Sequence, residues 1–250
     1  MKRKFSTISS IDLDKPLSWQ DPFFITLDMD WCHDEVLYDT IDLLESSSVS
    51  ATCFVTHKTK ALERLHQNKN FEIGIHPNFN PLLAGDLANH RDAETILDKI
   101  FEIVPGAKSL RSHSMTQNSR LLDLFAEKGI THESNHFIPY HTGISIKPWK
   151  LWNNLCRVPY SWEDDVHILY SKIQIQEHNP SEIVLSSKKS NALMVFDFHP
   201  IHVYLNTESM DRYEFTRHLH QNPKELIKHR FKGYGTRTRL IDLLAMVHSL

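Results

Sequence analysis

Cysteine is scarce in this chain: its 250 residues include three, at positions 32, 53 and 156. They are too few and too irregularly spaced for a disulfide framework or a cysteine-based zinc site. The chain also lacks any run of about 18 apolar residues, so we expect no membrane-spanning helix. Its basic start, "MKRK", is not followed by an apolar segment and does not predict a secretory signal. These absences favour a cytoplasmic protein.

Positive charge is not in excess either. The chain has 28 Lys and Arg against 31 Asp and Glu, a formal net charge of −3, which does not indicate a nucleic-acid-binding protein. A hydrophobic content of 40% and a charged content of 24% are ordinary for a globular protein. At this length we expect a single domain over residues 1–250, with its core motifs in about 20–200 and a helical region at 220–250.

Short runs of apolar, β-branched or aromatic residues alternate with segments of helical spacing. The runs predict strands at residues 23–30, 51–57, 71–77, 109–113 and 192–200. Apolar residues spaced three or four apart predict helices at residues 34–47, 93–104, 118–129 and 236–250. This alternation is typical of βα units with a parallel sheet. Residues 140–190 are harder to interpret, because prolines interrupt any periodicity there.

Polar residues follow the apolar part of these predicted strands, near the carboxyl end of each. They are Asp28 and Asp30, His76 and Asn80, Arg111 and His113, and His199. In a parallel α/β barrel all strand carboxyl ends open on the face that holds the active site. Residues spread over about 170 positions are therefore predicted to converge on one pocket. Each has a structural alternative, such as a helix cap for Asp30 or a surface ion pair for Arg111.

This ordered set resembles the polysaccharide deacetylase family, the NodB homology domain of carbohydrate esterases. "TLDMD" (26–30) is similar to the family's first motif, and "ATCFVTH" (51–57) to the segment after it. "FEIGIHPNFNP" matches the second motif in register from Glu72 to Pro81. "SLRSHS" with the later "KGIT" resembles the third motif, and "MVFDFHP" the last. The details "DMDW", "WEDD" and "GYGTRTRL" resemble a divergent subgroup linked to O-antigen-type surface-polysaccharide biosynthesis.

The resemblance covers roughly residues 20–200 and implies an α/β fold. The family's fold is a distorted (β/α) barrel of about seven parallel strands, with the active site at their carboxyl ends. By the same resemblance Asp28 is the general base, Arg111 holds Asp28 ionised, and His199 is the general acid that protonates the departing amine. An aspartate of "WEDD" orients His199; Asp165 is our candidate, and Asp164 stays open as the alternative.

The resemblance also implies a divalent metal bound by Asp30 and His76, which explains how two neighbouring acids are tolerated. The family's second histidine ligand falls on Asn80. An amide oxygen is a weaker and harder donor than imidazole, so we expect a lower affinity for zinc and more tolerance of other cations. Zn²⁺ is the expected metal, with Co²⁺, Mn²⁺ or Fe²⁺ as alternatives. His113 and His33 are alternative ligands, and His113 has the further alternative of a pocket wall.

The implied activity is removal of an N-acyl group, most simply N-acetyl, from a sugar nucleotide, a lipid-linked glycan or an oligosaccharide. Four aromatic residues near the motifs are candidates for stacking on sugar rings, or else core residues: Trp31, Phe79, Tyr160 and Trp162. One competing hypothesis is a non-catalytic glycan-binding relative that has lost its metal, and another is a hydrolase of a different non-peptide C–N bond. A base, its orienting arginine and an acid together favour the enzyme.

Overall fold

The computed structural model describes residues 4–86, 92–175, 178–186 and 191–246. Ten strands of this part of the chain form one sheet in the order β7-β8-β6-β5-β4-β3-β2-β10-β9, with β1 beside β2. The strands are β1 (Phe5–Ser6), β2 (Phe23–Asp28), β3 (Ala51–Val55), β4 (Phe71–Ile75), β5 (Ser109–Leu110), β6 (His132–Glu133), β7 (Trp149–Lys150), β8 (Cys156–Arg157), β9 (Trp162–Glu163) and β10 (Val195–Phe198). The β7–β8 pair is antiparallel, and the other strand pairs are parallel.

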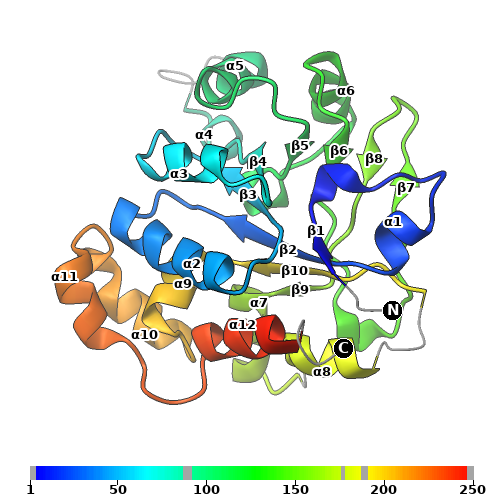
Figure 1. Cartoon of the computed structure of the whole chain (residues 1–250). Helices are drawn as coiled ribbons and strands as arrows, with labels where there is room; N and C mark the ends of the chain where they lie inside the picture. The colour runs from blue at the N-terminus through cyan, green and yellow to red at the C-terminus, as the bar shows by residue number, and fades with distance from the viewer. Residues whose placement is uncertain (1–3, 87–91, 176–177, 187–190, 247–250) are drawn as a thin grey trace.

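The sheet is strongly curled, as Figure 1 shows. Residues 156–163 bring its two sides together, because they pair with β6 at their start, through β8, and with β10 at their end, through β9. This architecture confirms the predicted distorted barrel. The strands beyond the expected seven are explained by two-residue pairings such as β1 and β7, which are too short to leave an alternating pattern in the sequence.

Helices cover the outside of the curled sheet (Figure 1). They are α1 (Leu17–Gln20), α2 (Asp34–Ser46), α3 (Ala61–Gln67), α4 (Asn80–Leu83), α5 (Ala93–Ile103), α6 (Ser119–Glu127), α7 (Asp164–Lys172), α8 (Pro180–Ser186), α9 (Pro200–Leu205), α10 (Met210–Thr216), α11 (Pro223–Leu226) and α12 (Thr236–Ala245). Helix α9 packs against α2 and α12. Among the described residues, no helix combines the length and the apolar character needed to cross a bilayer.

Strand β2 separates two hydrophobic cores, because successive side chains of a strand point to opposite faces. Phe23, Ile25 and Leu27 belong to the core between the sheet and the helices, whereas Phe24 belongs to a second core inside the curl. Ile8, Ile11 and Trp19 from the N-terminal segment join this inner core. A fully buried strand of this kind reads as a near-continuous apolar run, which is why "FFITLD" shows no alternation.

The inner face changes from apolar to polar toward the carboxyl ends of the strands. On β2 the order along this face is Phe24, Thr26 and Asp28, and on β10 it is Val195, Asp197 and His199 just beyond the strand. Because these two strands are parallel neighbours, with Thr26 opposite Asp197, the polar residues lie at the same height. The fold therefore places a layer of buried polar side chains, including Thr26, Asp28, Asp197 and His199 and here called the chamber, above an apolar interior.

Candidate active site

Arg111 follows β5 and lies inside this chamber with 1% of its surface exposed. Its Nη1 lies 3.1 Å from Asp28 Oδ1 and also contacts Asp197. Its Nε and Nη2 donate to the backbone oxygen and the hydroxyl of Ser134, each at 3.0 Å. Its guanidinium packs 4.2 Å from the centre of the Tyr160 ring. With both ends of the guanidinium held, Arg111 fixes the position of the Asp28 carboxylate.

The chamber holds more buried carboxylates than cations, which affects their protonation. Burial raises the pKa of Asp197 to about 7, against the lowering effect of Arg111. Burial and then the charges of Asp165 and Asp197 raise the pKa of Glu163 well above its usual range. Burial among these carboxylates therefore favours the protonated form of Glu163. Sequence reasoning missed both Glu163 and Asp197, because "WE" and "FDF" carry no motif that distinguishes a chamber wall from an ordinary strand.

Asp30, His76 and His113 form the second part of the chamber. Asp30 Oδ1 lies 3.3 Å from His76 Nε2 and 3.2 Å from His113 Nδ1. One ligand atom from each of the three residues lies within 4.8 Å of the others, so the cluster can hold a metal ion. His113 was an alternative at the sequence level. It reaches the cluster because its backbone N–H bonds to Pro77, which brings the β5 loop against the loop after β4.

The donor atoms of this cluster fit a small divalent cation. Tetrahedral zinc with bonds of about 2.0 Å separates neighbouring donors by about 3.3 Å, close to the two spacings around Asp30 Oδ1. This oxygen is buried and makes no hydrogen bond of good geometry despite its two ring neighbours. Burial alone would raise the pKa of Asp30, but the ring nitrogens of His113 and His76 lower it on balance. A carboxylate with one buried oxygen, held ionised between two imidazoles, suits a metal ligand.

Left-handed backbone occurs at two of the three ligand candidates, at Asp30 itself and just after His113. Asp30 and Trp31 have φ of 36° and 54°, and Ser114 and Met115, next to His113, have φ of 56° and 52°. Non-glycine residues in this region cost about 1–3 kcal/mol each and cluster at functional sites. The two turns present Trp31 against the His113 ring, with ring centres 5.1 Å apart. Such turns follow from tertiary contacts, which single-sequence patterns do not report.

His199 lies across the chamber and is held by Asp164. The His199 ring Nδ1 is 2.7 Å from Asp164 Oδ1, and its backbone N–H donates to Asp164 Oδ2 at 2.9 Å. Burial lowers the pKa of His199, but the Asp164 carboxylate outweighs it and raises the pKa well above the usual value. His199 Nε2 lies 3.6 Å from Asp30 Oδ2. The Asp164 carboxylate therefore favours the protonated imidazole, whose free edge lies toward the candidate metal cluster.

Two of the expected site residues, Asp165 and Asn80, make other contacts than the sequence suggested. Asp164, and not our candidate Asp165, contacts His199, because the first residue of α7 turns back toward the strand ends; Asp165 Oδ1 is buried without a hydrogen-bond partner. Asn80 begins α4, and its amide Nδ2 donates to Ser114 Oγ at 3.0 Å. His33 caps α2, where its Nδ1 accepts the N–H of Glu35.

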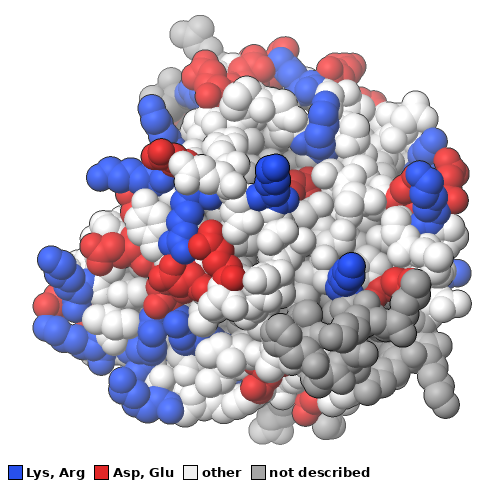
Figure 2. Space-filling view, viewed as in Figure 1, with Lys and Arg blue, Asp and Glu red and all other residues white. Residues whose placement is uncertain are grey.

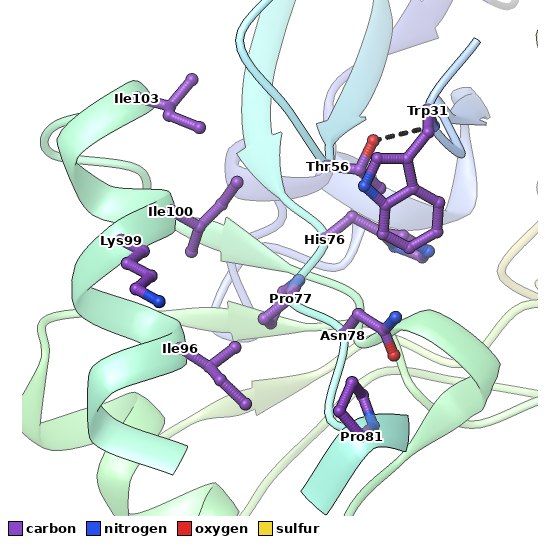
Figure 3. A pocket seen from close by; sticks show the side chains of 10 residues that line it. All are labelled: Trp31, Thr56, His76, Pro77, Asn78, Pro81, Ile96, Lys99, Ile100 and Ile103. Atoms are coloured by element: carbon purple, nitrogen blue, oxygen red, sulfur yellow. Dashed lines mark hydrogen bonds between the residues drawn. The ribbon is translucent and has the colours of Figure 1, made fainter. Parts of the chain in front are cut away.

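The aromatic candidates for sugar stacking divide by exposure. Phe79, Tyr160 and Trp162 are 1% exposed or less, so they are core residues. Trp31 is 40% exposed and lines a pocket of about 380 Å³ beside the candidate metal cluster. Figure 3 shows His76 and Trp31 on one side of this pocket and isoleucines of α5 on the other; the dashed line joins the Trp31 N–H to Thr56 Oγ1, at 3.0 Å. A concave site therefore adjoins the cluster.

Comparisons with known proteins agree with this geometry. The model of a family described as WbmS-like polysaccharide deacetylase matches residues 25–217. A crystal structure from Bordetella bronchiseptica, of a protein assigned as a polysaccharide deacetylase involved in O-antigen biosynthesis, is 45% identical, covers 98% of each chain and has a TM-score of 0.88. One assigned as a polysaccharide deacetylase from Mycobacterium smegmatis is 15% identical over 79% of this chain and 82% of its own, with a TM-score of 0.50, and shows the fold alone. No curated protein sequence matches the chain.

Proposed function

Because the chain belongs to the WbmS-like polysaccharide deacetylase family, we propose that it is a metal-dependent hydrolase that removes an N-acyl group, most simply N-acetyl, from a sugar. By analogy with its Bordetella relative, the sugar belongs to a precursor of O-antigen-type surface polysaccharide. The observation that carries the proposal is the arrangement of a held base and a held acid around one candidate metal cluster.

Asp28 and His199 have different protonation tasks in this proposal. Asp28, fixed by Arg111, takes a proton from the attacking water as the water oxygen bonds to the acyl carbon. His199, kept protonated by Asp164, donates its Nε2 proton to the sugar nitrogen as the C–N bond breaks. The products are the free amine and the carboxylic acid. Asp164 is a positioning residue, since it acts through the His199 ring.

Asp30, His76 and His113 would hold the metal, with His113 in the place that the sequence suggested for Asn80. A bound divalent cation supplies a Lewis acid that stabilises the negative charge developing on the acyl oxygen. Two imidazoles and one carboxylate are a donor set that zinc accepts while a fourth position stays open. We therefore propose Zn²⁺, and the weak-affinity expectation based on an amide ligand is replaced.

Acetate release from N-acetylated sugars by the zinc-loaded protein tests this function. Asp28→Asn should lower turnover by about 10²–10⁴-fold, the usual contribution of a general base, while metal content stays unchanged. Asp30→Asn should lose both metal and turnover. If Asp28→Asn instead removes the metal, the two aspartates have the opposite roles. If the wild-type protein binds glycans but releases no acetate with any metal, it is the non-catalytic relative.

A further inference from the structure

Part of the segment at residues 208–239 lies at the rim of the chamber. It contains α10 and α11, and Gln221 Nε2 donates to the backbone oxygen of Trp31 at 3.0 Å. The Tyr213 ring lies between the rings of His202 and His220, with centres 4.9 and 4.7 Å away. Tyr213 is therefore separated by one ring, that of His202, from the proposed acid His199, whose ring lies 5.7 Å from the His202 ring.

Tyr213 is half-buried and lies within electrostatic reach of the chamber. Burial raises its pKa, Arg217 lowers it, and Asp30 and His199 also act on it. The guanidinium carbon of Arg217 lies 5.8 Å from the centre of the Tyr213 ring. The Tyr213 ring thus lies between the exposed cation Arg217 on one side and His202, the neighbour of His199, on the other.

Charge is distributed unevenly between this segment and the rest of the chain. Residues 208–239 contain eight Lys or Arg and four Asp or Glu, a net charge of +4. Because the whole chain has a net charge of −3, the remaining residues have a net charge of −7. Figure 2 shows the blue side chains gathered over α10 and α11 at the lower left. Several of them pair within the fold, including Arg212 with Glu208 and Lys228 with Glu225. The segment is the basic edge of an otherwise acidic molecule.

Arg217 keeps donor capacity for a ligand. Its side chain is 66% exposed, and its ion pair is with Glu214 at 3.2 Å, one turn away on the surface. Exposed pairs of this kind contribute little, and a guanidinium has five N–H donors, so one carboxylate does not saturate it. Arginine binds phosphate through two parallel hydrogen bonds.

We propose that Tyr213 and Arg217 form a subsite for a phosphate group on the anomeric carbon of the substrate sugar. The inference rests on the proposed function and specifies its substrate class. In a 2-acylamino sugar the anomeric carbon is bonded to the carbon that bears the scissile nitrogen, so with the acyl group at the candidate metal cluster a phosphate there would lie only a few bonds away, toward the rim of the chamber. The chamber itself is rich in carboxylates, so an anionic group needs a cation at the rim. Nucleotide-linked and lipid-linked sugars share this phosphate.

Calorimetry of 2-aminohexose 1-phosphate binding to the metal-loaded protein tests the subsite without requiring turnover. We expect the 1-phosphate to bind at least tenfold more tightly than the free 2-aminohexose. Arg217→Gln should remove most of this advantage. Lys15→Gln is the matched control, because Lys15 is 77% exposed, has an acidic partner three residues away, and precedes α1 on the far side of the molecule; it should retain the full advantage.

Equal binding of the phosphorylated and free sugars, or equal effects of the two variants, would overturn the subsite. A preserved phosphate preference in a protein that releases no acetate would instead refute the proposed function and leave the subsite standing. Uridine-diphosphate and prenyl-diphosphate N-acetylhexosamines, compared in the same assay, separate the two sources of the phosphate. Tighter binding of either one identifies it, and the loss on Arg217→Gln should appear with both.

Discussion

Removal of the Arg111 side chain should destabilise the protein strongly. In Arg111→Met the buried carboxylates of Asp28 and Asp197 lose the cation that lies within 3.1 Å of the first and contacts the second. Breaking a buried ion pair by removing one partner costs about 3–5 kcal/mol. In a chain of this length about 1 kcal/mol changes the melting temperature by about 2–4 °C, so we expect a fall of about 6–20 °C.

Urea unfolding of the variant and a matched control measures this effect. Arg64 also contacts two carboxylates, Asp42 and Glu45, but its side chain is 33% exposed, so Arg64→Met should cost about 1 kcal/mol or less. Burial raises the pKa of Asp197 to about 7 and Arg111 lowers it, so without Arg111 this pKa should rise further; the loss should be smallest at low pH and grow as pH rises through the folded pKa. A loss below 1 kcal/mol at pH 7 would refute the buried network.

Two further changes have defined outcomes. Asp164→Asn removes the charge that raises the pKa of His199. Because the acid must be protonated and loses its proton as pH rises, the alkaline limb of the kcat profile should move to lower pH. An unmoved limb would contradict the assigned contact between Asp164 and His199. Gly235→Ala would place a Cβ 2.0 Å from the Asn206 backbone oxygen, so we expect a loss of about 1–3 kcal/mol in thermal unfolding, and an unchanged melting temperature would contradict the described packing before α12.

The sequence predicted the elements that carry strong periodicity. The predicted strands at 23–30 and 51–57 appear as β2 and β3, and the predicted helix at 34–47 as α2, with ends shifted by a few residues. Strands β6 to β9 were missed because two paired residues produce no pattern. The C-terminal helix begins at Thr236 as expected, and its last four expected residues lie outside the described part of the chain.

For the site as well, local sequence motifs predicted some residues, and others depended on tertiary contacts. Asp28, Arg111 and His199 were expected together because motif order places them at strand ends, and the structure brings them into one chamber; their catalytic roles stay a prediction. The choice between Asp164 and Asp165 depended on which face of α7 turns to the sheet, a tertiary property. The position of His113 next to Asp30 could not be predicted, because it depends on contact between two loops that lie far apart in the sequence.

Metal content of the purified protein, measured by elemental analysis on three forms, tests the central claim most directly. We expect near-stoichiometric zinc in the wild type and in Asn80→Ala, and little in His113→Ala, because His113 supplies a donor 3.2 Å from Asp30 Oδ1 whereas the Asn80 amide bonds Ser114. Loss of metal in Asn80→Ala with retention in His113→Ala would return Asn80 to the ligand set. An absence of metal in all three forms after incubation with zinc, cobalt or manganese would contradict the metal-dependent hydrolase.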